Sequence, residues 1–295
     1  MNRKWVVGAC VAGLFAVAVG VAVARGGQSA ETEAENSAQN APNACPKSVL
    51  TTFDPDKGDF FGHDVPIWSI DDGAAILFRT GMTIDADGAP NAYNSQNTGL
   101  DDLANAGEPG HWDGIVASRD GEPFVQGPDD PFPGFYVSQT ALVDWDKHIT
   151  DPARYVDASK IPYIVLPGEL SHQFGARLGD FAVVVNLRRG TAANAIFADI
   201  GTLGEGSIAL ANKIGIWSDA REGGTRGGIL YLVYPGSGDR HPHSLDEINA
   251  ETAKIFQDWG GMERLTSCSR DLQQPAHPQV ATQTNLQTGI STERP

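Results

Sequence analysis

The chain has 295 residues, of which 41% are hydrophobic and 20% charged, so it can form one domain with a sizeable core and is neither collagen, a coiled coil nor a multi-span membrane protein. Its 21 Lys and Arg residues stand against 37 Asp and Glu residues, and the resulting net charge of −16 disfavours nucleic acid as a partner and favours cations. The 34 glycines and 18 prolines favour many turns and short strands over a helical bundle.

Residues 1–24 have the organisation of a secretory signal peptide. Arg3 and Lys4 precede an uncharged apolar run that ends in the small-residue sequence Ala22-Val23-Ala24. The run is long enough for an uncleaved membrane anchor as well. Its many glycines and alanines favour cleavage, which predicts a secreted protein with a net charge of −18 and no membrane contact after cleavage.

The polar residues 25–44 predict a disordered linker, and residues 269–295 predict a disordered tail, because neither segment contains enough apolar surface to bury. The folded unit is therefore expected at 45–268. Cys45 and Cys268 frame it, and the third cysteine lies in the leader. An even pair in an exported chain predicts a Cys45–Cys268 disulfide, with two free thiols as the alternative.

Within the folded unit, short apolar runs separated by turn residues predict β-strands. They are expected at Ala74–Arg79, Gly114–Ala117, Pro123–Gln126, Phe135–Ser138, Tyr163–Leu166, Phe181–Asn186, Ala195–Ile200 and Gly228–Tyr234. One helix is expected to start near Ser207, and another to start at the Ser244–Glu247 capping box and to stop at Gly260. Strands dominate without βαβ alternation, which predicts a mainly β domain with a few helices, either a barrel or a sandwich.

The segment between 195 and 211 is the strongest candidate for catalysis. A strand ends in Asp199, a glycine-rich loop carries Glu205, and a helix follows. Two carboxyl groups on the ends of rigid elements suit acid–base work on a glycosidic bond. In the structural alternative, which the spacing alone favours, Asp199 caps a turn and Glu205 supports the helix N-terminus.

Asp85 and Asp87 resemble the start of a calcium-binding loop, but Gln96 stands where that loop needs its closing glutamate. A plain turn or a pair of sugar-contacting acids is expected instead, and no metal ion. The chain contains no serine-hydrolase motif and no phosphate-loop motif. No cofactor is expected.

Aromatic side chains can stack on sugar rings, although packing in the core is their ordinary role. Tyr93, Trp112 and Tyr136 are the aromatic candidates for contact with a saccharide, and Gln126 is the amide candidate.

Four stretches carry a resemblance to a known family. They are Ala75–Gly88, a strand before an acidic turn; Gly134–Leu142; the pair Ile161–Pro167 and Leu178–Val185; and Phe197–Ala211, with an Asp after a strand and a Glu in Gly-Glu-x-Ser. In this order they resemble the chitosanases of glycoside hydrolase family 75. The resemblance covers about residues 74–234, most of the folded unit.

The resemblance implies an endo-acting enzyme that hydrolyses the β-1,4 bonds of chitosan with inversion, using Asp199 and Glu205. We expect the protein to be a monomer. The freer glycine loop favours Glu205 as the acid and Asp199 as the base. Family members have a longer loop between these two acids, whereas only five residues separate them here. A segment of this length allows the two carboxyl groups to lie roughly 6.5–9.5 Å apart, as in an inverting enzyme, or roughly 5 Å apart, as in a retaining one. The spacing in sequence therefore leaves the stereochemistry open.

Two further readings stay open. The strand, Asp, glycine loop and helix are also similar to the double-psi barrels of lytic transglycosylases and related cell-wall proteins, in which one acid is enough. This similarity predicts a barrel of double-psi type and, as a second function, cleavage of the peptidoglycan glycan. The third reading is a secreted glycan-binding module without catalysis.

Overall fold

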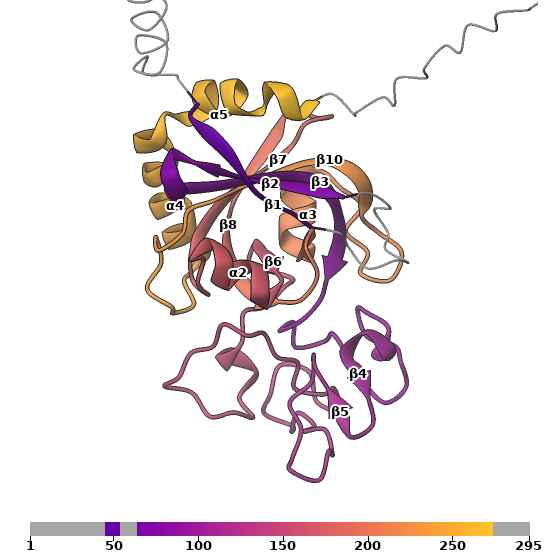
Figure 1. Ribbon diagram of the computed structural model, residues 1–295. Helices are drawn as coiled ribbons and strands as arrows, with labels where there is room; N and C mark the ends of the chain where they lie inside the picture. Colours follow the sequence, from indigo (N-terminus) through magenta and orange to yellow (C-terminus); the bar gives the residue numbers. More distant parts are fainter. Residues whose placement is uncertain (1–44, 54–63, 274–295) are drawn as a thin grey trace, which may run out of the picture. The chain divides into compact units, whose positions relative to one another are not determined.

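The structure, a computed structural model, describes residues 45–53 and 64–273. The predicted signal peptide and linker lie outside the described residues, as does the predicted tail from residue 274 onward. The strands are β1 (Lys47–Phe53), β2 (Val65–Ile70), β3 (Ala75–Asp85), β4 (Gly107–Glu108), β5 (His111–Trp112), β6 (Tyr163–Leu166), β7 (Phe181–Asn186), β8 (Thr191–Ile200), β9 (Glu205–Ser207) and β10 (Thr225–Val233) (Figure 1). The helices are α2 (Gly168–Phe174), α3 (Ile208–Ile214), α4 (Leu245–Trp259) and α5 (Gly261–Ser269), with 3-10 turns at Asp71–Gly73, Leu103–Ala106, Pro152–Arg154 and Arg270–Gln273.

Six of the strands close into a barrel, in the order β3, β10, β7, β8, β6, β9 and back to β3. The β3–β9 and β6–β8 pairs are parallel, and the other four pairs are antiparallel. β2 and β1 continue the sheet beyond β3. The predicted mainly β, barrel-like fold is therefore confirmed, and the sandwich alternative is excluded.

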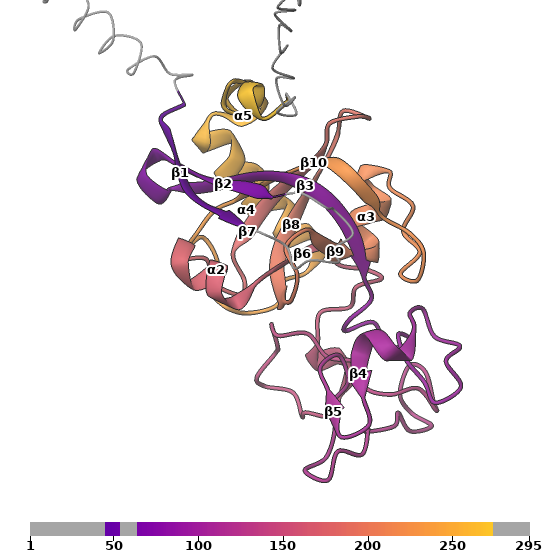
Figure 2. The same cartoon turned by 45° about the vertical axis from the view of Figure 1, so that its right-hand side comes forward.

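The barrel strands carry apolar side chains on both faces, because one face lines the interior of the barrel and the other packs against surrounding elements. On β7, Ala182 and Val184 pack inside the barrel, whereas Val183 and Val185 pack outside it in the cluster that includes residues of α4 and α5. β10 alternates in the same way. This two-sided burial explains why these strands are continuous apolar runs in the sequence rather than alternating ones. Figures 1 and 2 both show α5 against the barrel.

Both predicted helices are confirmed. The Ser207 hydroxyl caps α3 by accepting a hydrogen bond from the N–H of Leu210 at 3.1 Å. The capping box at α4 is complete, with Ser244 and Glu247 each bonding to the other's backbone N–H. Gly260 ends α4 with a φ of 118°, but the chain resumes as α5 instead of leaving the helical region. α5 is an element that the sequence did not indicate.

The long connection from β3 to β6 differs most from expectation. The three strands expected at Gly114–Ala117, Pro123–Gln126 and Phe135–Ser138 are only isolated bridges, because each segment is followed within a few residues by a turn that ends the pairing. β3 runs on to Asp85, and β1, β2 and α2 are additional. Beyond the predicted end at Cys268, helical structure continues to Gln273.

The Cys45–Cys268 disulfide is present, with the two Cα atoms 5.2 Å apart and a sequence separation of 223. It ties Cys45, two residues before β1, to α5, at the buried cluster of Val183 and Leu265. Within the described part of the chain, no helix is both long enough and apolar enough to cross a membrane.

Removing this disulfide is expected to destabilise the protein strongly. The bridge limits the unfolded chain through a loop of more than 220 residues, and loop-closure entropy gives an upper value of about 5 kcal/mol. Urea unfolding of the Cys45→Ala/Cys268→Ala protein should show a loss of this order. Thiol titration of the unreduced, denatured wild type should find neither of these two cysteines free; a double variant as stable as the wild type would contradict the prediction.

Candidate functional site

Acidic residues from three barrel strands come together where these strands meet the β3–β6 connection. A β-bulge in β8 places the first of them. Tyr163 and Ile164 pair with consecutive residues of β8, but Val165 then pairs with Asp199, so Ala198 is an extra residue. Asp199 therefore lies on the outward face with Val165, whereas strict alternation from Phe197 would have placed it inside the barrel.

Asp199 is 9% exposed, and its carboxylate is held by backbone donors. Its Oδ1 accepts hydrogen bonds from the N–H of Ala141 at 2.9 Å and of Ile200 at 2.8 Å. Burial, followed by the negative charge of Asp85, raises the pKa of Asp199 well above its usual value. A protonated carboxyl group at this position can give a proton to a leaving group.

Glu205 begins β9, which pairs with β3 on one side and β6 on the other. Its side chain is half-buried, and Oε2 accepts a hydrogen bond from the N–H of Thr202 at 2.8 Å. Gly201 makes this arrangement possible, since a Cβ there would lie 2.7 Å from the same Oε2 atom. Gly201 therefore allows the Glu205 carboxylate to approach the backbone of the loop closely. The negative charge of Glu205 also contributes to the raised pKa of Asp199.

Asp85 and Asp87 follow at the end of β3. Asp85 accepts a hydrogen bond from the N–H of Asp87 at 2.8 Å, and the hydroxyl of Tyr93 donates to Asp87 at 2.6 Å. Burial raises the pKa of Asp85 to about 6. Burial, then the charges of Asp85 and Asp199, raise the pKa of Asp87 well above its usual value. Asp85, Asp87 and Asp199 thus form one electrostatic cluster.

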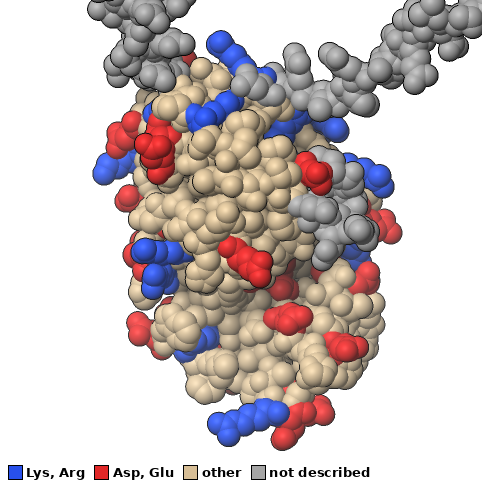
Figure 3. All heavy atoms as spheres, viewed as in Figure 1, with Lys and Arg blue, Asp and Glu red and all other residues tan. Residues whose placement is uncertain are grey.

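Two further residues, Tyr163 and Asp101, belong to this cluster, and nothing in the sequence indicated Asp101. The hydroxyl of Tyr163 on β6 donates a hydrogen bond to the backbone oxygen of Asp87 at 3.0 Å. The same side chain interacts with Asp85 and partly offsets the rise in its pKa. Oδ2 of Asp101 lies 3.4 Å from the hydroxyl oxygen of Tyr93, a longer and weaker interaction than the one between Tyr93 and Asp87. Tyr163 lies in the resemblance segment Ile161–Pro167, whereas Asp101 lies in no motif. Figure 3 shows several acidic side chains on the face between the barrel and the β3–β6 connection.

The other residues predicted to contact substrate, Trp112, Tyr136 and Gln126, form contacts within the β3–β6 connection. The Trp112 indole donates to the backbone oxygen of Gly121 at 3.0 Å, and its ring lies 6.4 Å from that of Tyr136. Gln126 is buried, and its amide bonds to the backbone of Phe132 and Tyr136, as well as to Pro90. Of the four candidates, only Tyr93 forms a hydrogen bond with an acid of the cluster. Trp112, Tyr136 and Gln126 pack or form hydrogen bonds within the loops of the connection.

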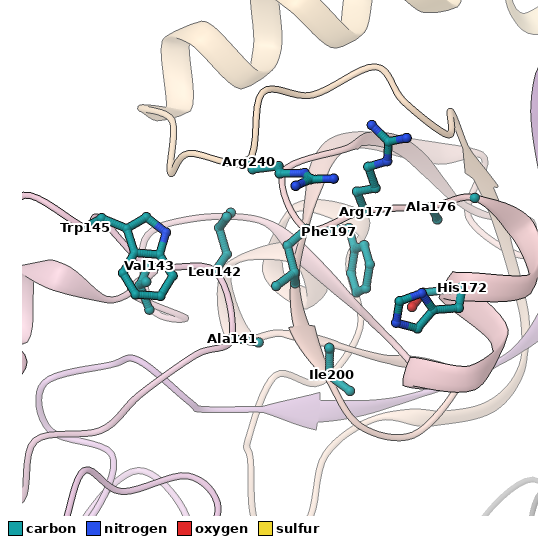
Figure 4. A pocket seen from close by; sticks show the side chains of 13 residues that line it. Ala141, Leu142, Val143, Trp145, His172, Ala176, Arg177, Phe197, Ile200 and Arg240 are labelled. Carbon is teal, nitrogen blue, oxygen red and sulfur yellow. The ribbon is translucent and has the colours of Figure 1, made fainter.

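A cavity of about 600 Å³ lies beside Asp199. Ala141 and Ile200, whose N–H groups hold the Asp199 carboxylate, form part of its wall. Trp145, which is 70% exposed, stands at one end of the cavity and His172 at the other (Figure 4). The described residues contain no group of three or more His, Cys, Asp or Glu side chains placed to hold a metal ion.

A comparison with protein-family models finds no match for this chain, and a search among curated proteins finds no similar sequence. The class that the fold and the site define is thus a six-stranded barrel with a buried acidic cluster beside a cavity. The chitosanase resemblance stays a hypothesis.

The burial of Asp85 predicts a pH-dependent cost in stability. Its pKa in the folded state is raised, so its contribution to stability is complete below about pH 4 and is lost as the pH rises through about 6. At pH 7 this loss amounts to about 3 kcal/mol. Asp85→Asn keeps the acceptor for the N–H of Asp87 but removes the charge, so it should be more stable than the wild type at neutral pH and no more stable at acid pH.

Urea unfolding of both proteins near pH 4 and pH 7 measures this difference. Asp258→Asn, at an exposed position on α4, is the matched control and should show little change with pH. A stability difference between Asp85→Asn and wild type that is the same at both pH values would contradict the assignment.

Proposed function

We propose that this protein is a secreted, endo-acting glycoside hydrolase that cleaves β-1,4 bonds in an amino-sugar polymer, with Asp199 and Glu205 as its acid–base pair. The observation that carries the proposal is the pairing of a buried carboxyl group of raised pKa, on Asp199, with a half-buried carboxylate on Glu205, each near the end of a strand. The two residues whose N–H groups bind Asp199 also line a cavity of about 600 Å³. Pockets of this size hold one or a few sugar rings.

Asp199 is the general acid in this proposal. Its raised pKa favours the protonated form of the carboxyl group, the form that can protonate the leaving glycosidic oxygen. Glu205 is the general base, which takes a proton from the water that attacks the anomeric carbon from the opposite face and inverts its configuration. These roles reverse the ones favoured by loop freedom alone, because burial of Asp199 outweighs the mobility expected of Glu205.

Chitosan is the first candidate substrate. The resemblance to family 75 implies it, and the strongly negative net charge, −18 after the predicted cleavage of residues 1–24, suits a polycation. The glycan of peptidoglycan is the second candidate, and one observation favours it. Arg177 and Arg240 line the cavity beside Asp199, where a fully cationic polymer gains nothing from them.

Incubation of the purified protein with chitosan, chitin and peptidoglycan, followed by measurement of new reducing ends, tests the proposal. Hydrolysis of at least one of them by the wild type, and none by Asp199→Asn, is the expected result. A non-catalytic glycan-binding module would bind a polymer in a pull-down experiment and release no reducing ends from any of the three.

If chitosan is the substrate, its hydrolysis should slow several-fold as salt rises from low to physiological ionic strength. The attraction between the acidic protein and the cationic polymer is screened beyond about 8 Å at that ionic strength. kcat/KM measured over a series of NaCl concentrations reports this effect. A rate that salt does not change would point to a neutral or acidic glycan instead.

A further inference from the structure

The cavity beside Asp199 combines an apolar wall, an aromatic platform and positive charge. Leu142, Phe197 and Ile200 contribute apolar surface to it. In Figure 4, Arg177 and Arg240 lie on one side of the cavity and Ala141 and Ile200 on the other. None of the acids of the catalytic cluster lines it, so its chemistry differs from that of the cluster.

A single buried carboxylate positions both arginines. Asp180 is fully buried and accepts hydrogen bonds from the N–H groups of Arg177, Gly236 and Gly238 at 2.8–2.9 Å. These bonds join the turn that carries Arg177 to the loop that carries Arg240. Gly179 lets that loop approach, because a Cβ there would lie 2.8 Å from the backbone nitrogen of Arg240. The two basic side chains are therefore placed by a preorganised backbone.

The two guanidinium groups have no acidic partner in the part of the chain that the structure describes. Neither Arg177 nor Arg240 forms a side-chain ion pair or hydrogen bond there, although the protein is strongly acidic overall. By contrast, Arg221 and Arg264 each bind a carboxylate. Two exposed, unpaired arginines at one cavity are ready-made donors for an anionic ligand, and the planar guanidinium suits a carboxylate in particular.

Trp145 supplies the surface on which a ring can stack. The guanidinium carbon of Arg154 lies 4.9 Å from the centre of its ring, while the side chain as a whole stays 70% exposed. Arg154 also bonds to the backbone oxygens of Asp144 and Lys147, so it holds the turn on both sides of the tryptophan. A large aromatic side chain that is fixed and yet exposed is typical of a binding site for an amphipathic ring.

From these features we propose that the cavity is a subsite for an acidic sugar, a pyranose ring that carries a carboxylate. Arg177 and Arg240 bind the carboxylate, and Trp145 and the apolar wall contact the ring. The inference rests on the proposed function for one point only, namely that the acidic sugar bound here is adjacent to the glycosidic bond that is cleaved. Ala141 and Ile200 border the cavity and also hold Asp199, so a ring bound here lies next to the acid.

Titration calorimetry on the full-length Asp199→Asn protein separates binding from turnover. The probes are the disaccharide of N-acetylglucosamine and N-acetylmuramic acid, which carries one carboxylate; neutral N,N′-diacetylchitobiose; cationic chitobiose; and inorganic sulfate. The acidic disaccharide should bind at least tenfold more tightly than the two other disaccharides. Added salt should weaken its binding, because charge-assisted hydrogen bonds supply the difference.

In the same background, Arg177→Gln and Arg240→Gln should each reduce the preference for the acidic disaccharide about tenfold. Trp145→Ala should instead weaken the binding of all three disaccharides. Arg189→Gln is the matched control, since Arg189 is exposed in the β7–β8 hairpin, at the other end of β8 from Ile200. Thermal melting checks that each variant is folded.

Equal binding of the three disaccharides, or of sulfate as tightly as the acidic disaccharide, would overturn the acidic-sugar subsite. An intact preference in both arginine variants would do the same. Failure of the proposed function looks different. In that case the wild type would bind the acidic disaccharide with the expected preference and would still release no reducing ends from any polymer.

Discussion

Replacing Asp199 with asparagine is expected to lower the rate of glycan hydrolysis by roughly 10²–10⁴-fold, the contribution of a general acid. Asparagine keeps the shape of the side chain and an oxygen that can accept the hydrogen bonds from Ala141 and Ile200. It cannot carry the proton that burial and the charge of Asp85 hold on the native carboxyl group.

The prediction distinguishes catalysis from structure because rate and stability move differently. Loss of a carboxylate that only caps a turn costs about 1 kcal/mol of stability and leaves turnover nearly unchanged. Asp199→Asn should instead be at least as stable as the wild type at neutral pH, because it removes a buried group of raised pKa. Reducing-end release and melting temperature, measured on the same preparation, report both quantities. Asp258→Asn serves as the control. An active Asp199→Asn protein that melts earlier would exclude Asp199 as the acid.

Glu205→Gln is expected to lower the rate by a similar factor, since an inverting mechanism needs both carboxyl groups. The amide oxygen can still accept the hydrogen bond from Thr202, so the loop should keep its conformation. Glu251→Gln, at an exposed position on α4, is the matched control and should retain full activity.

Asp85→Asn separates the two candidates for the partner of Asp199. If Glu205 is the base, Asp85→Asn stays active, but the basic limb of its pH–rate profile moves to lower pH. The reason is that the charge of Asp85 raises the pKa of Asp199, and removing it lets the general acid lose its proton earlier. An inactive Asp85→Asn protein together with an active Glu205→Gln protein would transfer the role of partner to Asp85. If Asp199 alone is needed, the single-acid mechanism of the peptidoglycan hypothesis gains support.

Elements that depend on local sequence were predictable. The capping box at Ser244 and the N-cap at Ser207 satisfy backbone donors within one turn of helix, so the two helices could be placed from a few residues. The apolar runs of β6, β7, β8 and β10 are buried on both faces and were recognised as strands without knowledge of their partners. The disulfide followed from an even pair of cysteines in an exported chain.

The arrangement of the candidate site was decided by contacts between residues far apart in the chain. The extra residue Ala198 turns Asp199 to the outer face, and it is recognisable only from the pairing of β8 with β6. Asp85 acquires its pKa of about 6 from burial at the end of β3, in a cluster with Tyr163 of β6. Composition and periodicity cannot report such effects, since burial and electrostatic coupling depend on distances that the closed barrel sets.

The sequence alone was sufficient for the fold class, the two capped helices, the disulfide and the choice of Asp199 and Glu205 as candidate acids. Tertiary structure alone decided which groups surround Asp199, which acids have raised pKa values, and that Trp145, Arg177 and Arg240 border the same cavity. The physical reason is the range of the forces involved. Capping and strand propensity act over a few residues of chain, whereas desolvation, charge coupling and cavity shape act through space between segments that only folding brings together.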